Sequence, residues 1–335
     1  MSYEDLKHMP KVELHCHLEL AFRKATLRGW AMEKGMAVAR EVDFDREFLI
    51  KEPMDDLPSA LHKFLNTRDV IDTEAKVEQL TFEACEDMFL LSNVRILELR
   101  YAPSFLLDAH PCMDADRMLE AILRGIARAE AAYPMVVGLI GLLQRIKSVE
   151  DNAFWCDWIL ERKAHFVGMD LADDEVSYPA SPFAPLFQKA KAQGLGITVH
   201  AGEPAVPGAA KNILVALDEL GADRIGHGVQ AIHDAEVVAR LAKDGVPLEL
   251  CPWSNVLTRA VQDLKSHPFK RLMDAGVRTT VNTDDHGVMD ISLIQECEHL
   301  IQHLNLGMED LRQCNQWARE ASFISKQRIQ QVWPD

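Results

Sequence analysis

His15 and His17, near the start of the chain, are separated by a single residue. In a β-strand such a pair points to one side, so the two imidazoles are expected to share one face. Two later apolar segments, each with the pattern of a short strand, run up to His200 and to Asp284. Three imidazoles and one carboxylate form a donor set that zinc accepts, with a further position left for water in a catalytic site. We therefore predict one catalytic metal site, suited to Zn²⁺, with His15, His17, His200 and Asp284 as ligands.

Two further residues close to these ligands could move protons. Glu203 follows His200 by three positions, in the loop after the segment, where a carboxylic acid can reach over a bound metal without binding it. A general acid requires this placement. His227 ends another apolar segment and stands between two glycines. The residues alone are compatible with two roles for His227, a further metal ligand or a base beside the attacking water.

Short apolar runs alternate with longer helical stretches along the chain, which is typical of βα units and a parallel sheet. Eight such units favour an α/β fold of the closed (β/α)8 (TIM) barrel type, in which reacting groups lie at the carboxyl ends of the strands. The alternative is an open doubly wound sheet, but no glycine-rich phosphate loop follows the first strand. The expected strands are 12–17, 95–101, 135–143, 166–171, 196–200, 224–227, 247–250 and 277–284.

One domain, residues 1–335, is expected to contain the whole barrel. The stretch of about 23–91 is too long for one connection and predicts extra helices over the carboxyl-terminal mouth of the barrel. Within it, Leu57, Leu61 and Phe64 recur at the spacing of one helical face. Such a face suits either a lid over the site or ordinary core packing.

The composition narrows the class of ligand. Of 335 residues, 48% are hydrophobic and 26% are charged, and the formal net charge is −16. Nucleic-acid binding draws its affinity from Lys and Arg that neutralise phosphates, so we expect a small-molecule substrate and no nucleic acid. No segment has the roughly 18 apolar residues of a membrane span, and no signal peptide is recognised, so no membrane partner is expected. Seven cysteines without a CxxC pair fit reduced thiols and a cytoplasmic location.

Five short blocks in a fixed order resemble the signature blocks of the adenosine deaminase family. They are KVELHCHL at 11–18, HAGE at 200–203, RIGHG at 224–228, CPWSN at 251–255 and NTDD at 282–285. Two further stretches, ELRYAP at 98–103 and GMDLA at 168–172, are similar to the family's second and fourth strands. One tetrapeptide alone would be weak evidence, whereas five blocks in order across most of the chain are strong evidence.

The resemblance implies a zinc-dependent deaminase that converts adenosine or 2′-deoxyadenosine into inosine or 2′-deoxyinosine and ammonia. It assigns one zinc ion per chain to the four ligands named above. Glu203 would donate a proton to purine N1, and His227 would orient and deprotonate the attacking water. Asp285 would hydrogen-bond purine N7, Ser254 would support His227, and the face of Leu57, Leu61 and Phe64 would close over the nucleoside.

Two departures from the family pattern bear on the substrate. Leu-Asp-Gly commonly follows the second zinc histidine, whereas this chain has Glu19, which is one methylene longer and could fill the space of a ribose. The fourth strand usually ends in a glycine whose N–H is open to purine N3; Asp173 stands there and could crowd the base or make a new polar contact. In addition, His286 replaces a familiar proline. A modified adenosine nucleoside, such as aminodeoxyfutalosine, and free adenine are therefore alternative substrates.

Three other classes fit the residues less well. A two-metal amidohydrolase would carry a carboxylated lysine at the end of the fourth strand, where this chain has Ala172. Polynucleotide deaminases combine H-x-E with P-C-x-x-C, and the cysteine pair is not completed after Cys112. A purine-binding protein that had lost catalysis would be expected to have lost part of the metal and acid–base set.

Overall fold

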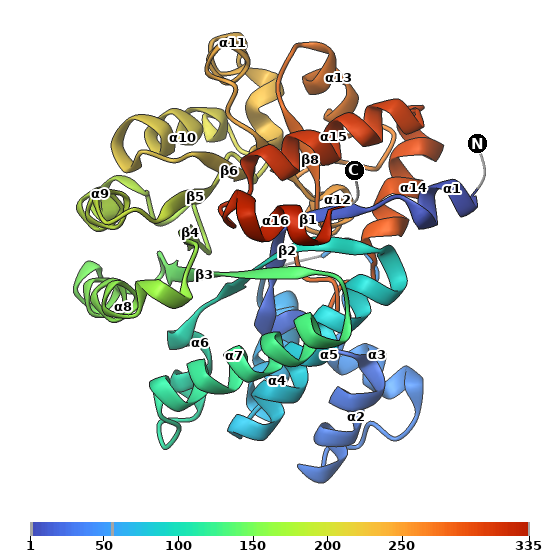
Figure 1. Ribbon diagram of the computed structural model, residues 1–335, viewed down its shortest axis with the longest axis vertical. Coiled ribbons are helices and arrows are strands. Elements are labelled where there is room, and N and C mark those ends of the chain that lie inside the picture. The colour runs from blue at the N-terminus through green and yellow to red at the C-terminus, as the bar shows by residue number, and fades with distance from the viewer. Residues whose placement is uncertain (1–2, 55–56, 334–335) are drawn as a thin grey trace.

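The computed structural model describes residues 3–54 and 57–333, and the side chains of residues 4–54 and 62–333. Its eight strands are parallel, and each pairs with the next along the chain. Helices on the connections surround the strands (Figure 1). The (β/α)8 barrel predicted from the sequence is confirmed. The strands are β1 (Lys11–His17), β2 (Val94–Tyr101), β3 (Val136–Gln144), β4 (Gly168–Ala172), β5 (Gly196–Ala201), β6 (Arg224–His227), β7 (Leu248–Leu250) and β8 (Thr279–Val281).

Local sequence signals set the ends of several helices. The side chain of Asp234 accepts hydrogen bonds from free N–H groups of the first turn of α11 (Ala235–Asp244), and Gly245 ends this helix at a φ of 66°. Asp114 caps α7 (Ala115–Ala132) in the same way.

The α-helices are α1 (Tyr3–His8), α2 (Lys24–Glu33), α3 (Glu41–Phe48), α4 (Leu57–Val70), α5 (Glu74–Ser92), α6 (Pro103–Ala109), α7 (Ala115–Ala132), α8 (Val149–Glu161), α9 (Ala184–Ala192), α10 (Ala209–Val215), α11 (Ala235–Asp244), α12 (Pro252–Leu257), α13 (Phe269–Asp274), α14 (Leu293–Leu304), α15 (Met308–Ala321) and α16 (Lys326–Val332). Shorter helical turns are Leu18–Leu20, Lys163–His165, Ser181–Phe183, Ala216–Leu220 and Val229–His233.

The last strand is shorter than the sequence predicted. The expected strand 277–284 is regular only over Thr279–Val281. Beyond it, the side chain of Asn282 takes over part of the pairing, because its Oδ1 atom accepts a hydrogen bond of 3.1 Å from the backbone N–H of Leu14 in β1. An amide side chain thus joins the eighth strand to the first, and beyond it Asp284 pairs with β1 through its backbone.

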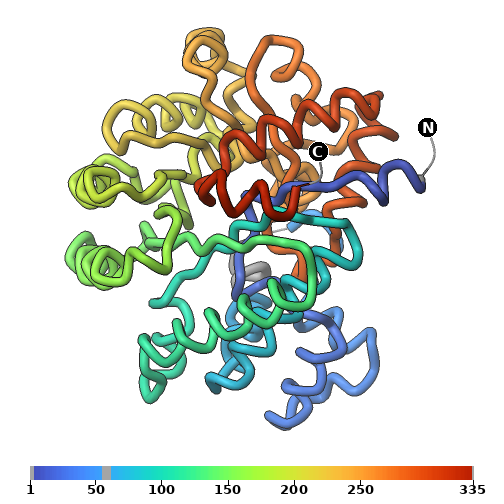
Figure 2. Tube along the Cα trace, in the orientation of Figure 1, coloured from blue at the N-terminus to red at the C-terminus, as the bar shows by residue number. Residues whose placement is uncertain are grey.

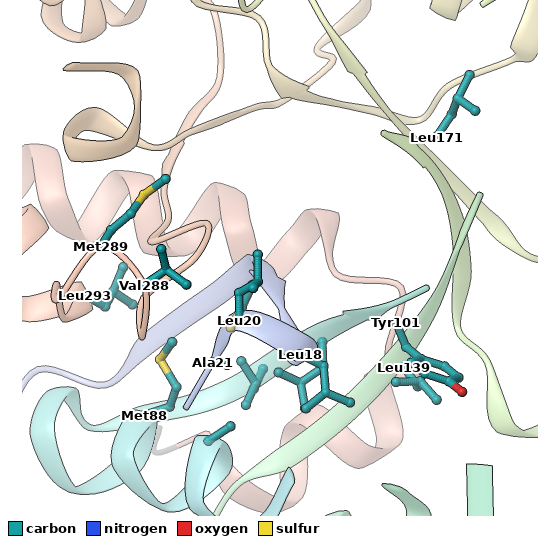
Figure 3. Close-up of a cluster of buried hydrophobic side chains, with 14 of the residues drawn as sticks. Leu18, Leu20, Ala21, Met88, Tyr101, Leu139, Leu171, Val288, Met289 and Leu293 are labelled. Carbon is teal, nitrogen blue, oxygen red and sulfur yellow. The ribbon is translucent and has the colours of Figure 1, made fainter. Parts of the chain in front are cut away.

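The main apolar core lies between the outer face of the strands and the helices. Figure 3 shows one part of it, where Leu20 lies near Val288 and Leu18 lies on the side of Tyr101 and Leu139. Burial of apolar surface contributes roughly 25 cal/mol per Å² and is the main stabilising contribution to such a fold. The core therefore fixes the strands whose carboxyl ends carry the predicted site.

The interior of the barrel is charged rather than apolar. Glu98, Arg100, Asp170, Arg224 and Glu249 are each at most 1% exposed. A buried charge is tolerated only when it is paired and hydrogen-bonded. Arg100 binds Asp170 and Glu249, and Arg224 binds Glu98 and Glu249, so the five side chains form one network below the mouth.

The carboxyl-terminal segment covers the opposite end of the barrel. α16 packs against β2 and β3 and lies across the strands (Figures 1 and 2). The ring of Phe323 fills space left by Gly168, where a Cβ atom would come within 2.6 Å of the ring. The guanidinium of Arg224 lies 3.7 Å from the centroid of the same ring. The barrel is thus closed below, and its accessible end is the one that carries the histidines.

The long stretch after β1 forms α2, α3 and α4 before α5 packs against α7. The chain after α3 runs along the mouth: the N–H of Ile50 donates to the carbonyl of Val288 at 2.8 Å, and that of Met54 to the carbonyl of Leu257 at 2.8 Å. Extra helices therefore form in this stretch, as predicted, and their placement over the mouth stays a prediction. Of the described helices, none is long and apolar enough to cross a membrane.

The three residues predicted as a lid lie on α4. Phe64 is half-buried and packs against the main core. The side chains of Leu57 and Leu61 lie outside the described residues. The lid function of this face stays a prediction.

Candidate metal centre and active site

Four predicted metal ligands meet at the carboxyl-terminal mouth of the barrel. The Nε2 atom of His200 lies 3.1 Å from that of His15 and 3.3 Å from that of His17. Asp284 Oδ1 lies 3.3 Å from the Nε2 atoms of both His15 and His17. The structure therefore brings together all four residues, although they come from β1, β5 and the segment after β8.

The donor atoms of this cluster are arranged to bind a metal ion rather than to form hydrogen bonds with one another. His15 Nδ1 lies 3.0 Å from Glu249 Oε2, and His200 Nδ1 lies 3.2 Å from Asp170 Oδ1. Because a carboxylate accepts, each Nδ1 carries the proton and each Nε2 keeps its lone pair. Burial lowers the pKa of both imidazoles, which favours their neutral form. Two facing lone pairs repel unless a cation lies between them, so the cluster fits a zinc-like ion.

His17 is in a more acidic environment than the other two imidazoles. Burial alone would lower its pKa, but the hydrogen bond to Asp284 and the charge of Asp285 raise the pKa of His17 to about 9. Burial alone would likewise raise the pKa of Asp284, but the nearby His227 and the hydrogen bond from His17 hold it well below its usual range. Metal ligands must be deprotonated, so a metal ion at this position would take the place of the His17 proton.

Three predicted site residues have left-handed backbone conformations, with φ at 58° for His227, 65° for Asp284 and 81° for Asp173. For residues other than glycine this costs about 1–3 kcal/mol and persists only where the surroundings fix it. β1 supplies this support for Asp284, whose N–H donates to the carbonyl of His15 at 2.9 Å and whose carbonyl accepts from the N–H of His17 at 3.1 Å. The carboxylate is thereby turned back toward the histidines.

Glu203 and His227 stand together beside the metal ligands. Glu203 Oε2 lies 3.7 Å from His227 Nε2, and Asp284 Oδ2 lies 3.9 Å from the same nitrogen. The hydroxyl of Thr258 donates to Glu203 Oε1 at 3.0 Å, and the Gln230 side chain donates to the Glu203 carbonyl at 3.1 Å. The side chain of Glu203 is 25% exposed, whereas that of His227 is 2% exposed. Glu203 can therefore meet a ligand while His227 is held from behind.

The loop that carries Glu203 is fixed at its first residue. Both carboxylate oxygens of Glu175 accept from the N–H of Gly202 at 3.0 Å. Gly202 has a φ of 71°, and a Cβ atom there would come within 2.8 Å of Ile213. A side chain at this position would therefore be strained and crowded, and the glycine fixes the direction in which Glu203 leaves β5.

The predicted support of His227 by Ser254 is wrong. The Ser254 hydroxyl donates to Asp284 Oδ2 at 2.7 Å. The neighbour of His227 is instead Asn255, whose Nδ2 atom lies 3.2 Å from His227 Nδ1. Successive residues of a helix such as α12 differ by about 100° in direction, so adjacent side chains serve different partners.

Asp285 is buried beside the cluster and has spare hydrogen-bonding capacity. Its side chain is 6% exposed, and its Oδ1 atom has no hydrogen-bond partner among the described residues. Burial and the charge of Asp284 raise the pKa of Asp285 well above its usual range. A protonated carboxyl group with an unpartnered oxygen suits a ligand that offers a hydrogen-bond acceptor.

The other two predicted substrate-binding residues follow different strands at the mouth, Glu19 after β1 and Asp173 after β4. Glu19 is 4% exposed, its Oε1 atom accepts from the N–H of Ala102 at 2.7 Å, and burial raises its pKa to about 7. Asp173 follows β4 and is accessible to solvent, yet the protein surrounds it closely enough that burial raises its pKa. Both carboxyl groups therefore lie at the mouth, one anchored and one accessible.

Sequence reasoning missed the residues that support the site from behind. Asp170 and Glu249 lie within strands that otherwise read as apolar, and a charge in such a strand is the signal that could have revealed them. Thr258 and Gln230 lie in loop or turn segments, where the spacing of residues in the sequence does not indicate the direction of a side chain. The supporting residues that were missed are Asp170, Glu175, Gln230, Glu249, Asn255 and Thr258.

Comparisons with known proteins agree with this architecture. The family model described as adenosine deaminase matches residues 10–333. The chain is 31% identical over 328 residues to the adenosine deaminase of Plasmodium falciparum, which covers 96% of this chain and 88% of that protein. It is 28% identical to the solved adenine deaminase of Arthrobacter aurescens, with a TM-score of 0.85 and 96% of both chains covered. It is 27% identical to the N6-methyl-AMP deaminase of Arabidopsis thaliana, with a TM-score of 0.83 and coverage of 99% and 97%.

Proposed function

Because this chain belongs to the adenosine deaminase family, we propose that it hydrolyses adenosine and 2′-deoxyadenosine to inosine and 2′-deoxyinosine with release of ammonia. The chain is an aminohydrolase that acts on adenosine-like purines. The convergence of His15, His17, His200 and Asp284, with closest contacts of 3.1 to 3.3 Å, carries the proposal. Potential ligand atoms of His15, His200, His227 and Asp284 lie within 4.8 Å of one another, and those of His17, Asp284 and Asp285 do as well, so Asp284 links both groups.

The proposed cofactor is one zinc ion per chain, held by these four residues. Zinc in such a site acts as a Lewis acid and lowers the pKa of a water molecule from about 15.7 to about 7. The carboxylates of Glu249 and Asp170 support this assignment, because they orient the imidazoles of His15 and His200 with Nε2 toward the centre.

The acid–base residues complete the proposed reaction. Glu203 donates a proton to purine N1 as water adds to C6, and ammonia leaves from the resulting tetrahedral carbon. The hydroxyl of Thr258 and the backbone contact with Gln230 hold Glu203 in place. His227 orients the attacking water from its position 3.7 Å from Glu203. Asp285, with its raised pKa, carries the proton that it donates to the acceptor N7.

The charge at the mouth favours an uncharged substrate. Glu19 and Asp173 lie at the ends of β1 and β4, where a 5′-phosphate would add negative charge to an acidic site. We therefore place the nucleosides ahead of nucleotides. Two alternatives are a modified adenosine nucleoside, such as aminodeoxyfutalosine, and free adenine. The burial of Glu19 against Ala102 favours adenine, because the longer side chain occupies space that a ribose would need.

The test is ammonia release by the zinc-loaded protein from adenosine, 2′-deoxyadenosine, 5′-modified adenosines, adenine and AMP. We expect the highest kcat/KM with the two nucleosides. The control variant Glu203→Gln should keep its zinc and lose about 10²- to 10⁴-fold in kcat, as expected for loss of a general acid. A variant as active as the parent would show that Glu203 does not protonate N1, and faster turnover of adenine or of a 5′-modified nucleoside would replace the proposed substrate.

A further inference from the structure

A chain of three buried polar side chains leads away from the active site behind His227. His227 Nδ1 lies 3.2 Å from Asn255 Nδ2, and Asn255 Oδ1 lies 3.2 Å from His267 Nε2. His267 Nδ1 in turn accepts a hydrogen bond of 3.1 Å from the backbone N–H of Phe269. Asn255 is 0% exposed, His227 1% and His267 2%. No solvent molecule is needed to explain any of these contacts.

The backbone N–H at the far end fixes the direction of every hydrogen bond in this chain. The N–H of Phe269 can only donate, so His267 Nδ1 is the acceptor. Burial lowers the pKa of His267 to about 3, so its ring is neutral and its proton lies on Nε2. His267 Nε2 therefore donates to Asn255 Oδ1, and the amide group of Asn255 is left to donate to His227 Nδ1.

The direction also fixes the orientation of the Asn255 amide. With its nitrogen and oxygen exchanged, an amide N–H would face the Nε2–H of His267, and two donors would meet. The backbone of Asn255 is anchored as well, because its N–H donates to Cys251 and its carbonyl accepts from Val261. The arrangement with Nδ2 toward His227 is thus the one that satisfies every partner.

We propose that His267 and Asn255 are positioning residues that hold His227 in the tautomer with its proton on Nε2. In this tautomer Nδ1 accepts from Asn255, and Nε2, which faces Glu203 and Asp284, donates. A proton added to Nδ1 would point at the amide N–H of Asn255. His227 therefore orients the attacking water as a hydrogen-bond donor and does not take its proton. This inference rests on the proposed function only in one respect, namely that the group oriented by His227 Nε2 is the attacking water.

The tautomer can be read directly from the ring signals of isotopically labelled histidine in the NMR spectrum of the zinc-loaded protein. The variant His227→Asn assigns the signal by its disappearance. At pH 7 we expect His227 as the Nε2–H tautomer. A ring protonated on Nδ1, alone or on both nitrogens, would overturn the proposal, whatever the enzyme's substrate proves to be.

Two substitutions test the direction of the chain. Asn255→Asp keeps the shape but accepts on both oxygens, so it should move the His227 proton to Nδ1 and lower kcat at least tenfold with little change in KM. The exposed Asn305→Asp is the matched control and should leave both readouts unchanged. His267→Gln can still accept from Phe269 and donate to Asn255, so it should keep the tautomer and kcat within threefold.

His267→Phe removes both functions of the imidazole and should not retain the parental tautomer. If Asn255→Asp kept the parental tautomer and kcat, or if His267→Phe behaved like His267→Gln, the positioning role would be excluded. Zinc content and thermal unfolding of each variant separate these outcomes from loss of the fold. A parent protein that shows the predicted tautomer but releases no ammonia would contradict the proposed function alone.

Discussion

The Ser254 hydroxyl donates to Asp284 Oδ2 at 2.7 Å, while Asp284 Oδ1 lies 3.3 Å from the Nε2 atoms of His15 and His17. The two oxygens of one carboxylate therefore have different partners. Ser254 fixes the rotation of the carboxylate and so directs Oδ1 at the two histidines. This division of roles was not expected from the sequence, which assigned Ser254 to His227.

Ser254→Ala should weaken zinc binding about tenfold, because partners that orient a metal ligand typically contribute 10- to 100-fold to affinity. The measurement is competition with a chelator of known affinity. Ser181→Ala, at an exposed position, is the control for removal of a serine hydroxyl. An unchanged affinity in Ser254→Ala would show that β1 alone holds Asp284 in position.

His15→Ala and Asp284→Ala should each lose zinc, because a set of four ligands loses a donor atom. Metal analysis of the purified variants against the parent provides the measurement. His165→Ala, an exposed histidine on the turn Lys163–His165, should keep its metal. Full zinc occupancy in both active-site variants would refute the ligand assignment.

Thr258→Val should lower kcat up to about tenfold, because a hydrogen bond contributes about 0.5–1.5 kcal/mol and this one holds Glu203 in position. Steady-state kinetics with adenosine would measure the effect. Thr258→Ser keeps the hydroxyl and should recover most of the activity. Equal kcat values for the valine and serine variants would mean that Glu203 is positioned by its backbone contacts.

The strand ends could be predicted from the sequence because two physical rules apply to them. The period of two in a strand places His15 and His17 on one side, and a barrel brings the carboxyl ends of all strands to one mouth. His200 and Asp284 follow from the same rules, although Asp284 lies beyond the regular part of β8. The eight-unit barrel was also predictable, because short apolar strand segments alternate with longer helical segments along the sequence.

The supporting residues could not be predicted because their directions depend on three-dimensional packing. Ser254 and Asn255 are adjacent on α12, and only the fold decides that one serves Asp284 and the other His227. His267, one of several histidines away from strand ends, had no sequence signal that set it apart. Periodicity gives the face on which a residue lies but not the partner that it meets there.

Asp72 should stabilise the helices beside the mouth in a pH-dependent way. Burial alone would raise its pKa, but hydrogen bonds from Lys34, at 2.5 Å, and from Lys76, at 2.8 Å, lower it from 3.8 to about 2. A folded-state pKa below the unfolded value means that the stabilisation is present above pH 3.8 and is lost as the pH falls toward 2. Screening by solvent reduces it to about 1 kcal/mol.

Urea unfolding of Asp72→Asn and of the parent, compared between pH 7 and pH 2.5, would measure this dependence. The difference in the free energy of unfolding should be about 1 kcal/mol at pH 7 and should shrink at pH 2.5. Asp69→Asn is the control, because Asp69 is 59% exposed and pairs with its neighbour Arg68. A difference that is independent of pH would show that Asp72 acts through packing and not through its charge.

The double variant Glu19→Asp, Leu20→Gly should raise kcat/KM for adenosine relative to adenine. Glu19 reaches the N–H of Ala102 at 2.7 Å, and an aspartate, one methylene shorter, would withdraw from this contact and open space at the end of β1 for a ribose hydroxyl. Leu20 is 7% exposed, so its removal costs stability, and the single variant Leu20→Gly is needed as the control. The ratio of the two kcat/KM values, measured by ammonia release, is independent of the amount of folded enzyme. If this ratio stayed constant or fell in the double variant relative to Leu20→Gly, Glu19 would not be the residue that limits access of the ribose, and Asp173 at the end of β4 would be the position to substitute next.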